Sequence, residues 1–412
     1  MLEPYRALDL TDEKGLFCGK LLADLGAEVI QVEKPGGNPA RSIPPFYGDT
    51  TDPERSLFWF AFSAGKKSIT LNLESETGKD IFKRLARTAD FIIESFPAGY
   101  LASIGLGYEQ LAETNPQLIM VSITPFGQTG PYKDYKAGDL IASAMGGMVY
   151  CTGETDRAPV RISIDQAYCQ VSVHAAIGLL LALYNRAVTG RGQWVDVSMQ
   201  ASMVRTLHTQ LPYWEYSKRL VQRSGIYRFR GGVSTQEIWP CKDGFVSWMF
   251  FGGAVGTQQM RLMVEWMEAR GSAGSLSTEV QDWASLDLSK VSPEKIKSWE
   301  RIIGDFFLAH TKAELYGEAL ERRVPLTPLN DVSDVLKDEQ LAARGFWVDI
   351  DHPELGTSLP YPGSLFQTTE EECMPKVKRR APFIGEHNTE IYVGKLGLSE
   401  GELSSLKRNG IV

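Results

Sequence analysis

The stretch PVRISIDQAYCQVSVHAAIGLLLALYNRAVTGRGQ, residues 159–193, decides the fold of this chain. Its centre, residues 174–183, is an apolar run without Asp, Glu, Lys or Arg. Such a run predicts a helix that is buried on most of its surface. A basic turn ends the helix, and the alternation of residues 194–199 then predicts a strand. On periodicity alone a plain core helix is as good an interpretation as a helix that borders a binding site. The start of the helix, residues 165–168, is expected at the mouth of any site, because helix N-termini favour anions and acyl oxygens.

The first thirty residues predict a β-α-β unit. Residues 6–10 form a short apolar strand, residues 15–25 have helical spacing that Gly26 ends, and residues 28–33 alternate as a second strand. This order predicts an α/β fold with a parallel, Rossmann-like sheet. The same alternation of strands and helices continues to about residue 200.

A glycine fingerprint for dinucleotide binding is missing from the sequence. No G-x-G-x-x-G follows the first strand, and both Gly105-Leu106-Gly107 and Gly190-Arg191-Gly192 lack the third glycine. A nicotinamide-dependent dehydrogenase is therefore disfavoured. The sequence also contains no G-x-S-x-G and no phosphate-binding P-loop.

Length and composition indicate a two-domain globular protein. The chain has 412 residues, of which 43% are hydrophobic and 23% charged. After about residue 205 the sequence becomes rich in Trp, Gly, Arg and Met. We predict a large domain over residues 1–204, a smaller α+β domain with glycine-rich loops over residues 205–325, and a return to the large domain over residues 326–412.

Several other classes of protein are disfavoured by bulk properties. The net charge of −8 argues against nucleic-acid binding, which needs a basic face. The absence of an unbroken apolar run of about 18 residues predicts no transmembrane helix and no membrane partner. The first ten residues, MLEPYRALDL, lack the pattern of a signal peptide. The five cysteines are scattered without C-x-x-C spacing, which favours a reducing cytoplasm. The five dispersed histidines and the lack of H-E-x-x-H predict no metal site.

Seven blocks spread over nearly the whole chain have a specific sequence and a fixed order. They are LADLGAEVIQVEKPGG, FSAGKKSITLNL, ADFIIESFPAGYLASIGLGYE, ITPFGQTGPY, GDLIASAMGG, AIGLLLALYNRAVTGRGQWVDVSMQ and APFIGEHNTEIYVGKLGLSE. These blocks resemble the family III CoA-transferases, the group of formyl-CoA and carnitine CoA-transferases. The resemblance implies a Rossmann-like large domain built from both ends of the chain, with the small domain inserted. It also implies a dimer in which two subunits thread through one another as interlocked rings.

The resemblance implies a transfer of coenzyme A between carboxylates. In this family an aspartate attacks the donor thioester, forms a mixed anhydride and releases the CoA thiolate. The thiolate returns to give an aspartyl-CoA thioester, and the acceptor carboxylate then takes CoA through a second anhydride. A glycine loop supplies N–H groups for the oxyanions and keeps water away from the anhydrides. Coenzyme A is thus expected as a substrate, without a tightly bound cofactor.

At the site itself the sequence departs from the family. Ungapped alignment from either side places Tyr168 at the position of the nucleophilic aspartate, and a phenol cannot form the acyl anhydride. Asp139 occupies the position of a nearby acidic residue, and Gly231 and Gly232 match part of the glycine loop. Ser95 replaces an asparagine and Ser103 an arginine, while the usual A-G-P loop is shortened to Lys14-Gly15-Leu16. The positions at which the resemblance implies CoA contacts are Lys14, Gly15, Lys34, Leu71, Ser95, Phe96, Ser103 and Lys136.

These departures leave three hypotheses. In the first, the chain is a subunit that lacks the nucleophile, and a homologous partner supplies the aspartate. That assembly resembles the two-subunit benzylsuccinate CoA-transferases, which use succinyl-CoA. In the second, the chain forms an active homodimer and Asp165 replaces the nucleophile. Asp165 is equally an ordinary residue for a helix N-cap, and Tyr168 for packing with one hydrogen bond. In the third, the chain is a structural or regulatory paralogue.

Overall fold

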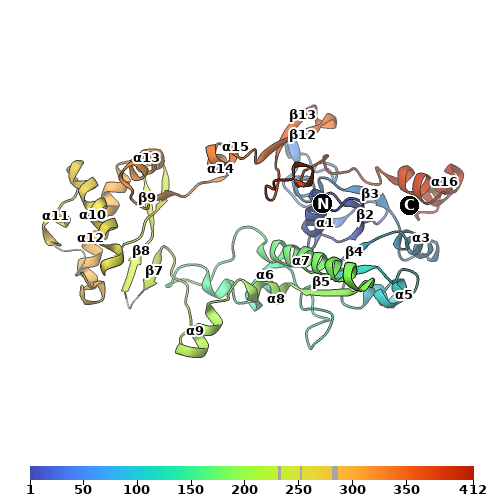
Figure 1. Cartoon of the computed structure of the whole chain (residues 1–412), viewed down its shortest axis with the longest axis horizontal. Helices are drawn as coiled ribbons and strands as arrows, with labels where there is room; N and C mark the ends of the chain where they lie inside the picture. The colour runs from blue at the N-terminus through green and yellow to red at the C-terminus, as the bar shows by residue number, and fades with distance from the viewer. Residues whose placement is uncertain (231–232, 251–252, 281–285) are drawn as a thin grey trace. The chain divides into compact units, whose positions relative to one another are not determined.

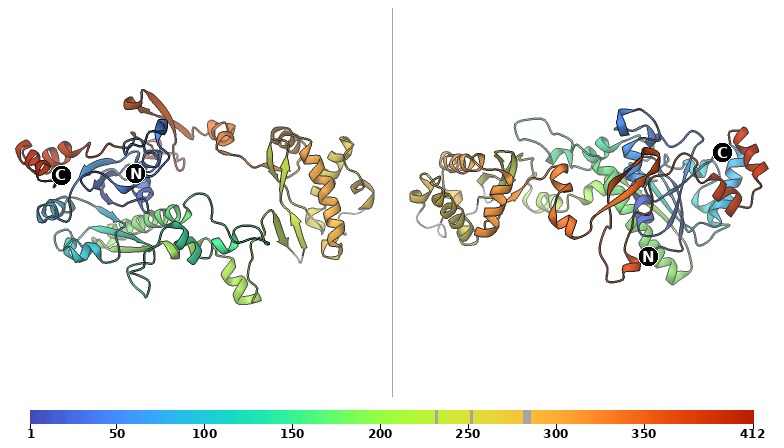
Figure 2. Two further views of the ribbon diagram at one scale, coloured as in Figure 1. Left: turned by 180° about the vertical axis from the view of Figure 1, so that it is seen from behind. Right: turned by 90° about the horizontal axis from the view of Figure 1, so that it is seen from above.

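The computed structural model describes residues 1–230, 233–250, 253–280 and 286–412. The chain divides into two compact units, each of which combines separate segments. The blue start and the red end of the chain both belong to the large unit (Figure 1; Figure 2). The large unit comprises Met1–Val149, Arg161–Leu220 and Glu339–Val412, and the small unit comprises Tyr150–Val160 and Val221–Asp338.

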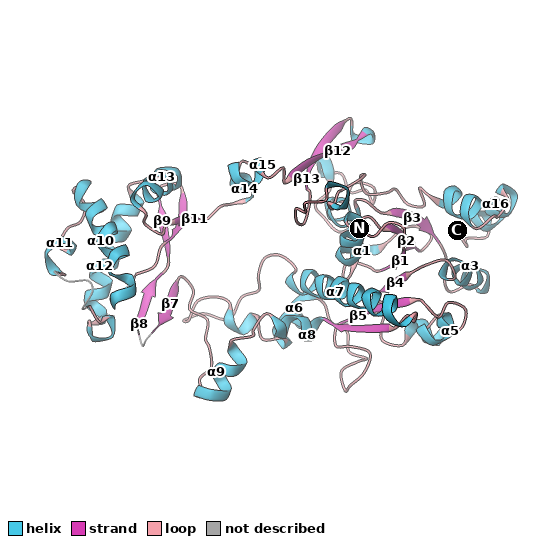
Figure 3. Cartoon of the chain, viewed as in Figure 1, coloured by secondary structure: helices cyan, strands magenta, loops and turns pink. Residues whose placement is uncertain are grey.

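A parallel sheet of six strands forms the centre of the large unit (Figure 3). The strand order β3-β2-β1-β4-β5-β6 is that of Rossmann folds, and the order reverses between β1 and β4. The predicted α/β fold with a parallel central sheet is therefore confirmed. The strands are β1 (Arg6–Leu10), β2 (Glu28–Glu33), β3 (Lys67–Thr70), β4 (Phe91–Glu94), β5 (Ile119–Thr124) and β6 (Trp194–Ser198).

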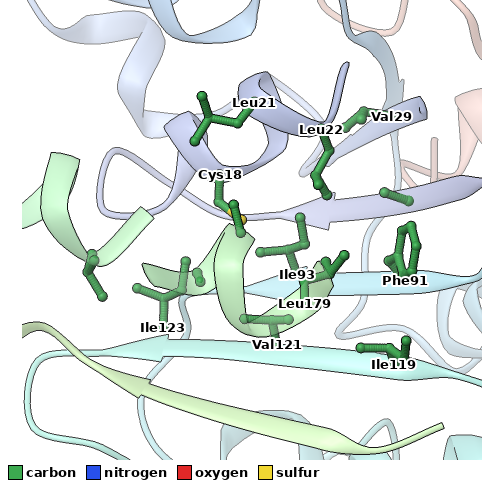
Figure 4. Close-up of a cluster of buried hydrophobic side chains, with 14 of the residues drawn as sticks. Cys18, Leu21, Leu22, Val29, Phe91, Ile93, Ile119, Val121, Ile123 and Leu179 are labelled. Atoms are coloured by element: carbon green, nitrogen blue, oxygen red, sulfur yellow. The ribbon is translucent and has the colours of Figure 1, made fainter. Parts of the chain in front are cut away.

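Helices cover both faces of this sheet because successive strand side chains point to opposite sides. On one face, Phe91, Ile93 and Val121 pack against Leu22 and Leu179, which come from two helices (Figure 4). The helices on this face are α1 (Leu16–Asp24), α6 (Asp139–Met145), α7 (Gln166–Thr189) and α8 (Met199–Arg205). Those on the other face are α3 (Glu76–Ala86), α4 (Tyr100–Ser103), α5 (Tyr108–Ala112) and α16 (Glu400–Arg408).

The long helix α7 is buried along one side only. Val171, Ala175, Leu179 and Ala182 lie in the core. The opposite side carries an apolar row, which we call the α7 stripe. Its exposed fractions rise to 65% at Leu181 and 74% at Tyr184. The stripe consists of Val173, Ile177, Leu181, Tyr184 and Val188.

The prediction of a helix buried on most of its surface is wrong for this chain, because nothing in the large unit covers the stripe. Among the described helices, α7 alone is long and apolar enough, by length and composition, to cross a membrane. Its other side nevertheless packs into the core against α1 and the sheet.

The small unit has a core rich in tryptophan. Trp239, Trp248, Trp266 and Trp299 are all buried in it, which accounts for the change of composition after residue 205. A three-stranded antiparallel sheet and a separate pair of antiparallel strands accompany its helices. Its elements are β7 (Tyr227–Arg230), β8 (Val233–Gln236), β9 (Ile238–Cys241), β10 (Gly244–Ser247), β11 (Thr327–Pro328), α10 (Gly253–Ala269), α11 (Leu276–Glu279), α12 (Pro293–Leu308), α13 (Lys312–Arg322) and α14 (Val332–Leu336).

The boundaries of the units differ from the predicted boundaries at 204/205 and 325/326. The large unit runs on to Leu220, because α8 packs on α6 and α7 and is followed by α9 (Gln210–Ser217). The small unit runs on to Asp338, because Leu326 lies in its core and β11 pairs with β10. Residues 150–160 join it as well, since Arg223 donates from Nε to the carbonyl oxygen of Glu154, at 2.8 Å.

A buried arginine joins the two ends of the chain within the large unit. Arg41 donates to both carboxylate oxygens of Glu33, at 2.7 and 2.8 Å, and to the carbonyl oxygen of Pro382 at 2.9 Å. Its guanidinium lies 3.9 Å from the ring centroid of Trp59. The C-terminal segment is thereby fixed on the N-terminal half of the unit. The remaining elements of this unit are α2 (Leu57–Ser63), α15 (Glu339–Ala343) and the hairpin of β12 (Trp347–His352) with β13 (Thr357–Pro362).

Replacing this arginine tests its contribution to stability. Arg41→Met leaves the buried Glu33 without its cation, so we expect the free energy of unfolding to fall by about 3–5 kcal/mol in urea denaturation. The control is Arg55→Met, because Arg55 faces Asp52 at 3.8 Å with both side chains about 40% exposed. An exposed pair of this kind contributes about 1 kcal/mol or less. Equal losses for the two variants would contradict the assignment.

Candidate active site

A pocket of about 530 Å³ opens at the carboxyl ends of β1, β2, β3 and β4. In open α/β sheets ligands bind at this edge, where the strand order reverses. We call it the switch-point pocket. It is lined by Leu10, Thr11, Asp12, Val32, Glu33, Lys34, Pro35, Asn38, Pro39, Leu71, Asn72, Leu73, Glu74, Ser95, Phe96, Tyr100 and Gly410.

Half of the predicted CoA-contact residues line this pocket. Lys34 and Leu71 follow β2 and β3, and Ser95 and Phe96 follow β4. The ring of Phe96 lies 4.9 Å from that of Tyr100, centroid to centroid, and the two form an aromatic wall. Tyr100, the first residue of α4, was not predicted from the sequence, although it lies only four residues after Phe96.

The turn between β1 and α1 closes one end of the pocket. Asp12 accepts a hydrogen bond from Ser95 Oγ at 2.8 Å, and its own N–H donates to the same hydroxyl at 3.0 Å. Lys14 forms an ion pair with Asp12. A Cβ at Gly15 would lie 2.7 Å from Thr11 Cγ2, so this glycine is required by packing. Lys14 and Gly15, predicted as CoA contacts, are thus engaged inside the turn, and neither lines the pocket.

Asp139 holds the start of α7. Its Oδ1 accepts a hydrogen bond from the N–H of Ala167 at 2.7 Å. Burial raises the pKa of Asp139, and the bond from Ala167 opposes that effect. Asp165 occupies the N-cap position but makes no capping bond with its side chain. The carboxylate of Asp139 therefore accepts the hydrogen bond of a free N–H group at the helix N-terminus, a role that the N-cap residue Asp165 does not fill.

Tyr168 lies half-buried beside the start of α6. A Cβ at Gly138 would be 3.2 Å from its hydroxyl oxygen. Burial, together with the nearby carboxylates of Glu13, Asp165 and Asp12, raises the pKa of Tyr168 to about 12. The phenol is therefore protonated at neutral pH.

Asp165 carries an accessible carboxylate near Tyr168. Its side chain is 44% exposed, and its Oδ1 lies 3.6 Å from Nη1 of Arg161, which is itself 51% exposed. No capping bond restricts it. The structure thus brings Asp139, Asp165 and Tyr168 together at the start of α7.

Other predicted site residues lie elsewhere. Ser103 is exposed on α4, where its hydroxyl donates to the carbonyl oxygen of Tyr100 at 2.7 Å. Lys136 is exposed in the connection between β5 and α6. Neither residue lines the switch-point pocket. Gly231 and Gly232 fall outside the described residues. Within the described ranges, no group of three or more His, Cys, Asp or Glu side chains is placed to hold a metal ion.

A buried carboxyl group lies next to the pocket. Glu94, 3% exposed, accepts a hydrogen bond from the N–H of Phe96 at 2.7 Å and so fixes the turn that carries Ser95 and Phe96. Ser122 also bonds to it, and in turn accepts a hydrogen bond from Trp194 Nε1 at 2.9 Å. Burial raises the pKa of Glu94 to about 7. The carboxyl group also borders a second, smaller pocket of about 210 Å³.

Comparison with known proteins assigns the chain to a family. The family model described as CoA-transferase family III matches residues 3–388. The chain belongs to the family III CoA-transferases. The resemblance drawn from the sequence blocks is therefore confirmed, and proteins of this type use CoA thioesters as substrates.

Relatives of this family III CoA-transferase match it from end to end. It is 34% identical to the succinyl-CoA:(R)-benzylsuccinate CoA-transferase subunit BbsE of Thauera aromatica, over 99% of this chain and 97% of that protein. It is 30% identical to the succinyl-CoA–L-malate CoA-transferase beta subunit of Chloroflexus aurantiacus, over 96% and 94%. A solved structure of a CAIB/BAIF family protein from Brucella suis superposes with a TM-score of 0.83, at 30% identity and over 95% and 98% of the two chains.

Glu94 should make the stability of this CoA-transferase depend on pH. The pKa of Glu94 rises from its ordinary value of 4.5 to about 7 on folding. Between these values the folded chain holds more protons than the unfolded chain, so stability falls as the pH rises. At pH 8, Glu94→Gln should be more stable than the parent chain by on the order of 3 kcal/mol, and this gain should vanish below pH 4.5.

Urea denaturation across pH 4.5–8 measures this difference. Glu109→Gln is the matched control, because Glu109 borders the same small pocket but is exposed. A gain for Glu94→Gln that does not change with pH would show that titration of Glu94 is not its cause.

Proposed function

We propose that this chain is one subunit of a heteromeric CoA-transferase, and that a homologous subunit supplies the nucleophilic aspartate. The observation that carries the proposal is the half-buried, protonated phenol of Tyr168 at the position where the family has its nucleophile. A phenol in this place forms no acyl anhydride, so the covalent steps have to occur on another chain.

The other carboxylates near Tyr168 support this division. Asp139 caps α7 through Ala167, and Asp12 is held by Ser95 and Lys14. A carboxylate that holds backbone in place is a poor nucleophile, because the attack would release the structure that it supports. In the proposed assembly, the role of this chain is thus to complete the scaffold around the reacting groups of the partner subunit.

Succinyl-CoA is the proposed donor, and benzylsuccinate or a similar carboxylic acid is the proposed acceptor. The support is the printed activity of the relatives: two that match nearly the whole chain are succinyl-CoA-dependent, and both are named as subunits. The cytoplasm is the proposed location, because the five cysteines are free thiols, as in a reducing compartment.

The α7 stripe supplies a surface for the partner. Leu181, Tyr184 and Val188 are each at least 65% exposed and lie three or four residues apart, so they form one apolar face. Exposed apolar faces of this kind mark protein–protein contacts. We place the homologous subunit here, in the interlocked arrangement that the family resemblance implies.

In a second candidate function, the chain is active as a homodimer and Asp165 is the nucleophile. The favouring observation is its exposed, uncapped carboxylate at the start of α7, beside Tyr168. In that case Asp165 would attack the donor thioester itself.

Transfer of CoA from succinyl-CoA to a panel of dicarboxylic acids separates these functions. The purified chain alone should be inactive, and a mixture with its co-encoded homologue should be active. In the mixture, Asp165→Ala and Tyr168→Phe should each leave kcat within about twofold of the parent, because neither side chain takes part in a covalent step.

Three other outcomes would contradict the proposed function. Activity of the chain alone that Asp165→Ala abolishes and Tyr168→Phe spares moves the nucleophile to Asp165. Activity alone that survives both changes rules out the division between subunits. A mixture without activity, or a chain that purifies without a homologue, would favour the hypothesis that the chain is a structural or regulatory paralogue.

A charge placed in the α7 stripe tests the contact. Leu181→Asp should raise the dissociation constant of the assembly about 100-fold or more, because it buries an unpaired carboxylate. Leu320→Asp is the matched control, since Leu320 is a leucine exposed to 61%, compared with 65% for Leu181, on α13 of the other unit. Sedimentation of the mixed subunits gives both constants, and similar values for the two variants would place the partner elsewhere.

A further inference from the structure

A third pocket of the large unit, of about 430 Å³, lies between β12 and the C-terminal segment of residues 378–387. We call it the β12 pocket. It shares no lining residue with the switch-point pocket. Its lining combines the apolar residues Ile350, Pro353 and Pro382 with charged ones. A ligand held there would leave the switch-point pocket free.

His387, which lines the β12 pocket, is fixed on β3 near the start of that strand. Its N–H donates to the carbonyl oxygen of Ser68 at 2.9 Å, and its Nδ1 accepts from the N–H of Ser68 at 3.2 Å. The N–H of Gly385 donates to the hydroxyl of Ser68 at 3.0 Å and holds the same segment in place. Because a backbone N–H can only donate, Nδ1 carries a lone pair, and the proton of the neutral ring lies on Nε2.

Arg379 brings a second donor to the same point. Its carbonyl oxygen accepts from the N–H of Gly65 at 2.9 Å, which fixes its backbone, and its Nη1 lies 3.3 Å from Nε2 of His387. Burial lowers the pKa of His387, so the ring is neutral at neutral pH. A guanidinium N–H only donates as well, so two donors face each other at Nε2. An oxyanion placed against both would accept from each of them.

The other cations of this pocket are already paired with carboxylates. The Nζ of Lys378 lies 2.6 Å from Glu3, and Nη1 of Arg380 lies 2.9 Å from Glu386. Among the described residues that line the pocket, Arg379 is the one arginine or lysine without an ion pair. Its charge is therefore available to a ligand.

Two acidic residues limit the charge that such a ligand can carry. Asp349 and Asp351 of β12 both line the pocket, and both are exposed. A doubly charged phosphate would be repelled by these two carboxylates, whereas a carboxylate carries a single charge that Arg379 balances. The apolar part of the lining favours a carboxylate that also has an apolar group.

We propose that Arg379 and His387 form a binding site for a small monocarboxylate with an apolar group, in a pocket that shares no residue with the switch-point pocket or with the start of α7. In the bound state the guanidinium of Arg379 and the Nε2–H of His387 both donate to the carboxylate, so the two donors no longer oppose each other. This site goes beyond the proposed function, because it does not depend on which chain supplies the nucleophile.

Binding of para-fluorobenzoate to the purified full-length chain, followed by the fluorine NMR signal of the probe, tests this site. We expect a dissociation constant on the order of 1 mM, as for a small ligand held by one ion pair and one further hydrogen bond. Arg379→Met should weaken binding at least about tenfold, because it removes a charge-assisted bond. His387→Asn should weaken it about threefold or more, since asparagine keeps an acceptor for Ser68 but lacks the Nε2–H.

Lys378→Met is the matched control, because it removes the same charge from the same pocket. Its ammonium group is paired with Glu3 at the surface, so the affinity for the probe should change by less than about twofold. Equal losses for Lys378→Met and Arg379→Met would reduce the effect to a general attraction by basic residues and overturn the proposal. An affinity that Arg379→Met leaves unchanged, or no binding by the parent chain well above the expected dissociation constant, would overturn it as well.

Inorganic phosphate separates a carboxylate site from a site for any oxyanion. We expect phosphate to displace the probe at least about tenfold less effectively than benzoate does, because Asp349 and Asp351 oppose a second negative charge. Displacement by phosphate at equal or lower concentration would contradict the assignment to carboxylates. Thermal unfolding by circular dichroism checks that each variant is folded. No CoA is transferred in these measurements, so their outcome is independent of the transfer assay that tests the proposed function.

Discussion

A buried ion pair beneath the sheet edge determines the shape of the site. Lys66, fully buried, lies 2.8 Å from Asp9 and donates to the carbonyl oxygen of Leu16 at 2.9 Å. The other oxygen of Asp9 accepts from the N–H and the hydroxyl of Thr11. Both ends of the turn between β1 and α1 are thus tied to one pair of charges. Because removing either partner would strand the other in the core, the turn has little freedom to change its path. The position of Asp12 follows from that constraint.

The acidic side chains around the site mainly organise backbone. Asp139 accepts a hydrogen bond from the N–H of Ala167 at the start of α7, Asp12 accepts one from the N–H of Lys14 before α1, and Glu94 holds the turn after β4. Each makes a hydrogen bond that a reacting carboxylate would have to break. The contacts that build the fold of the large unit are therefore separate from those that an acyl transfer would need. Tyr168 fits this arrangement as a packing residue with a protonated hydroxyl.

Local patterns in the sequence predict the sheet well and the site only in part. β1 and β2 begin and end where the alternation of apolar residues places them, because a strand in a parallel sheet is defined by its own pattern and its flanking turns. The helix predicted from residues 174–183 extends over Gln166–Thr189. Its polar start is fixed by Asp139, 28 residues earlier in the chain, and no local pattern reveals such a contact. The contact of Asp12 with Ser95 was missed for the same reason, since the two residues lie 83 positions apart. The exposure of the α7 stripe was missed because a periodic pattern of apolar residues does not show whether their own chain buries them.

The uncovered face of α7 makes the stability of this protein a property of its surroundings. Any molecule that binds the apolar row of the folded chain and ignores the unfolded chain shifts the equilibrium toward folding by mass action. The resistance of the chain to heat or proteases then depends on how much of that molecule is present. In a cell, synthesis of the chain in excess over the molecule that binds this row would leave Leu181 and Tyr184 exposed to chaperones and to self-association. Under the proposed function, the exposed row of this one helix makes balanced production of the two subunits a physical requirement.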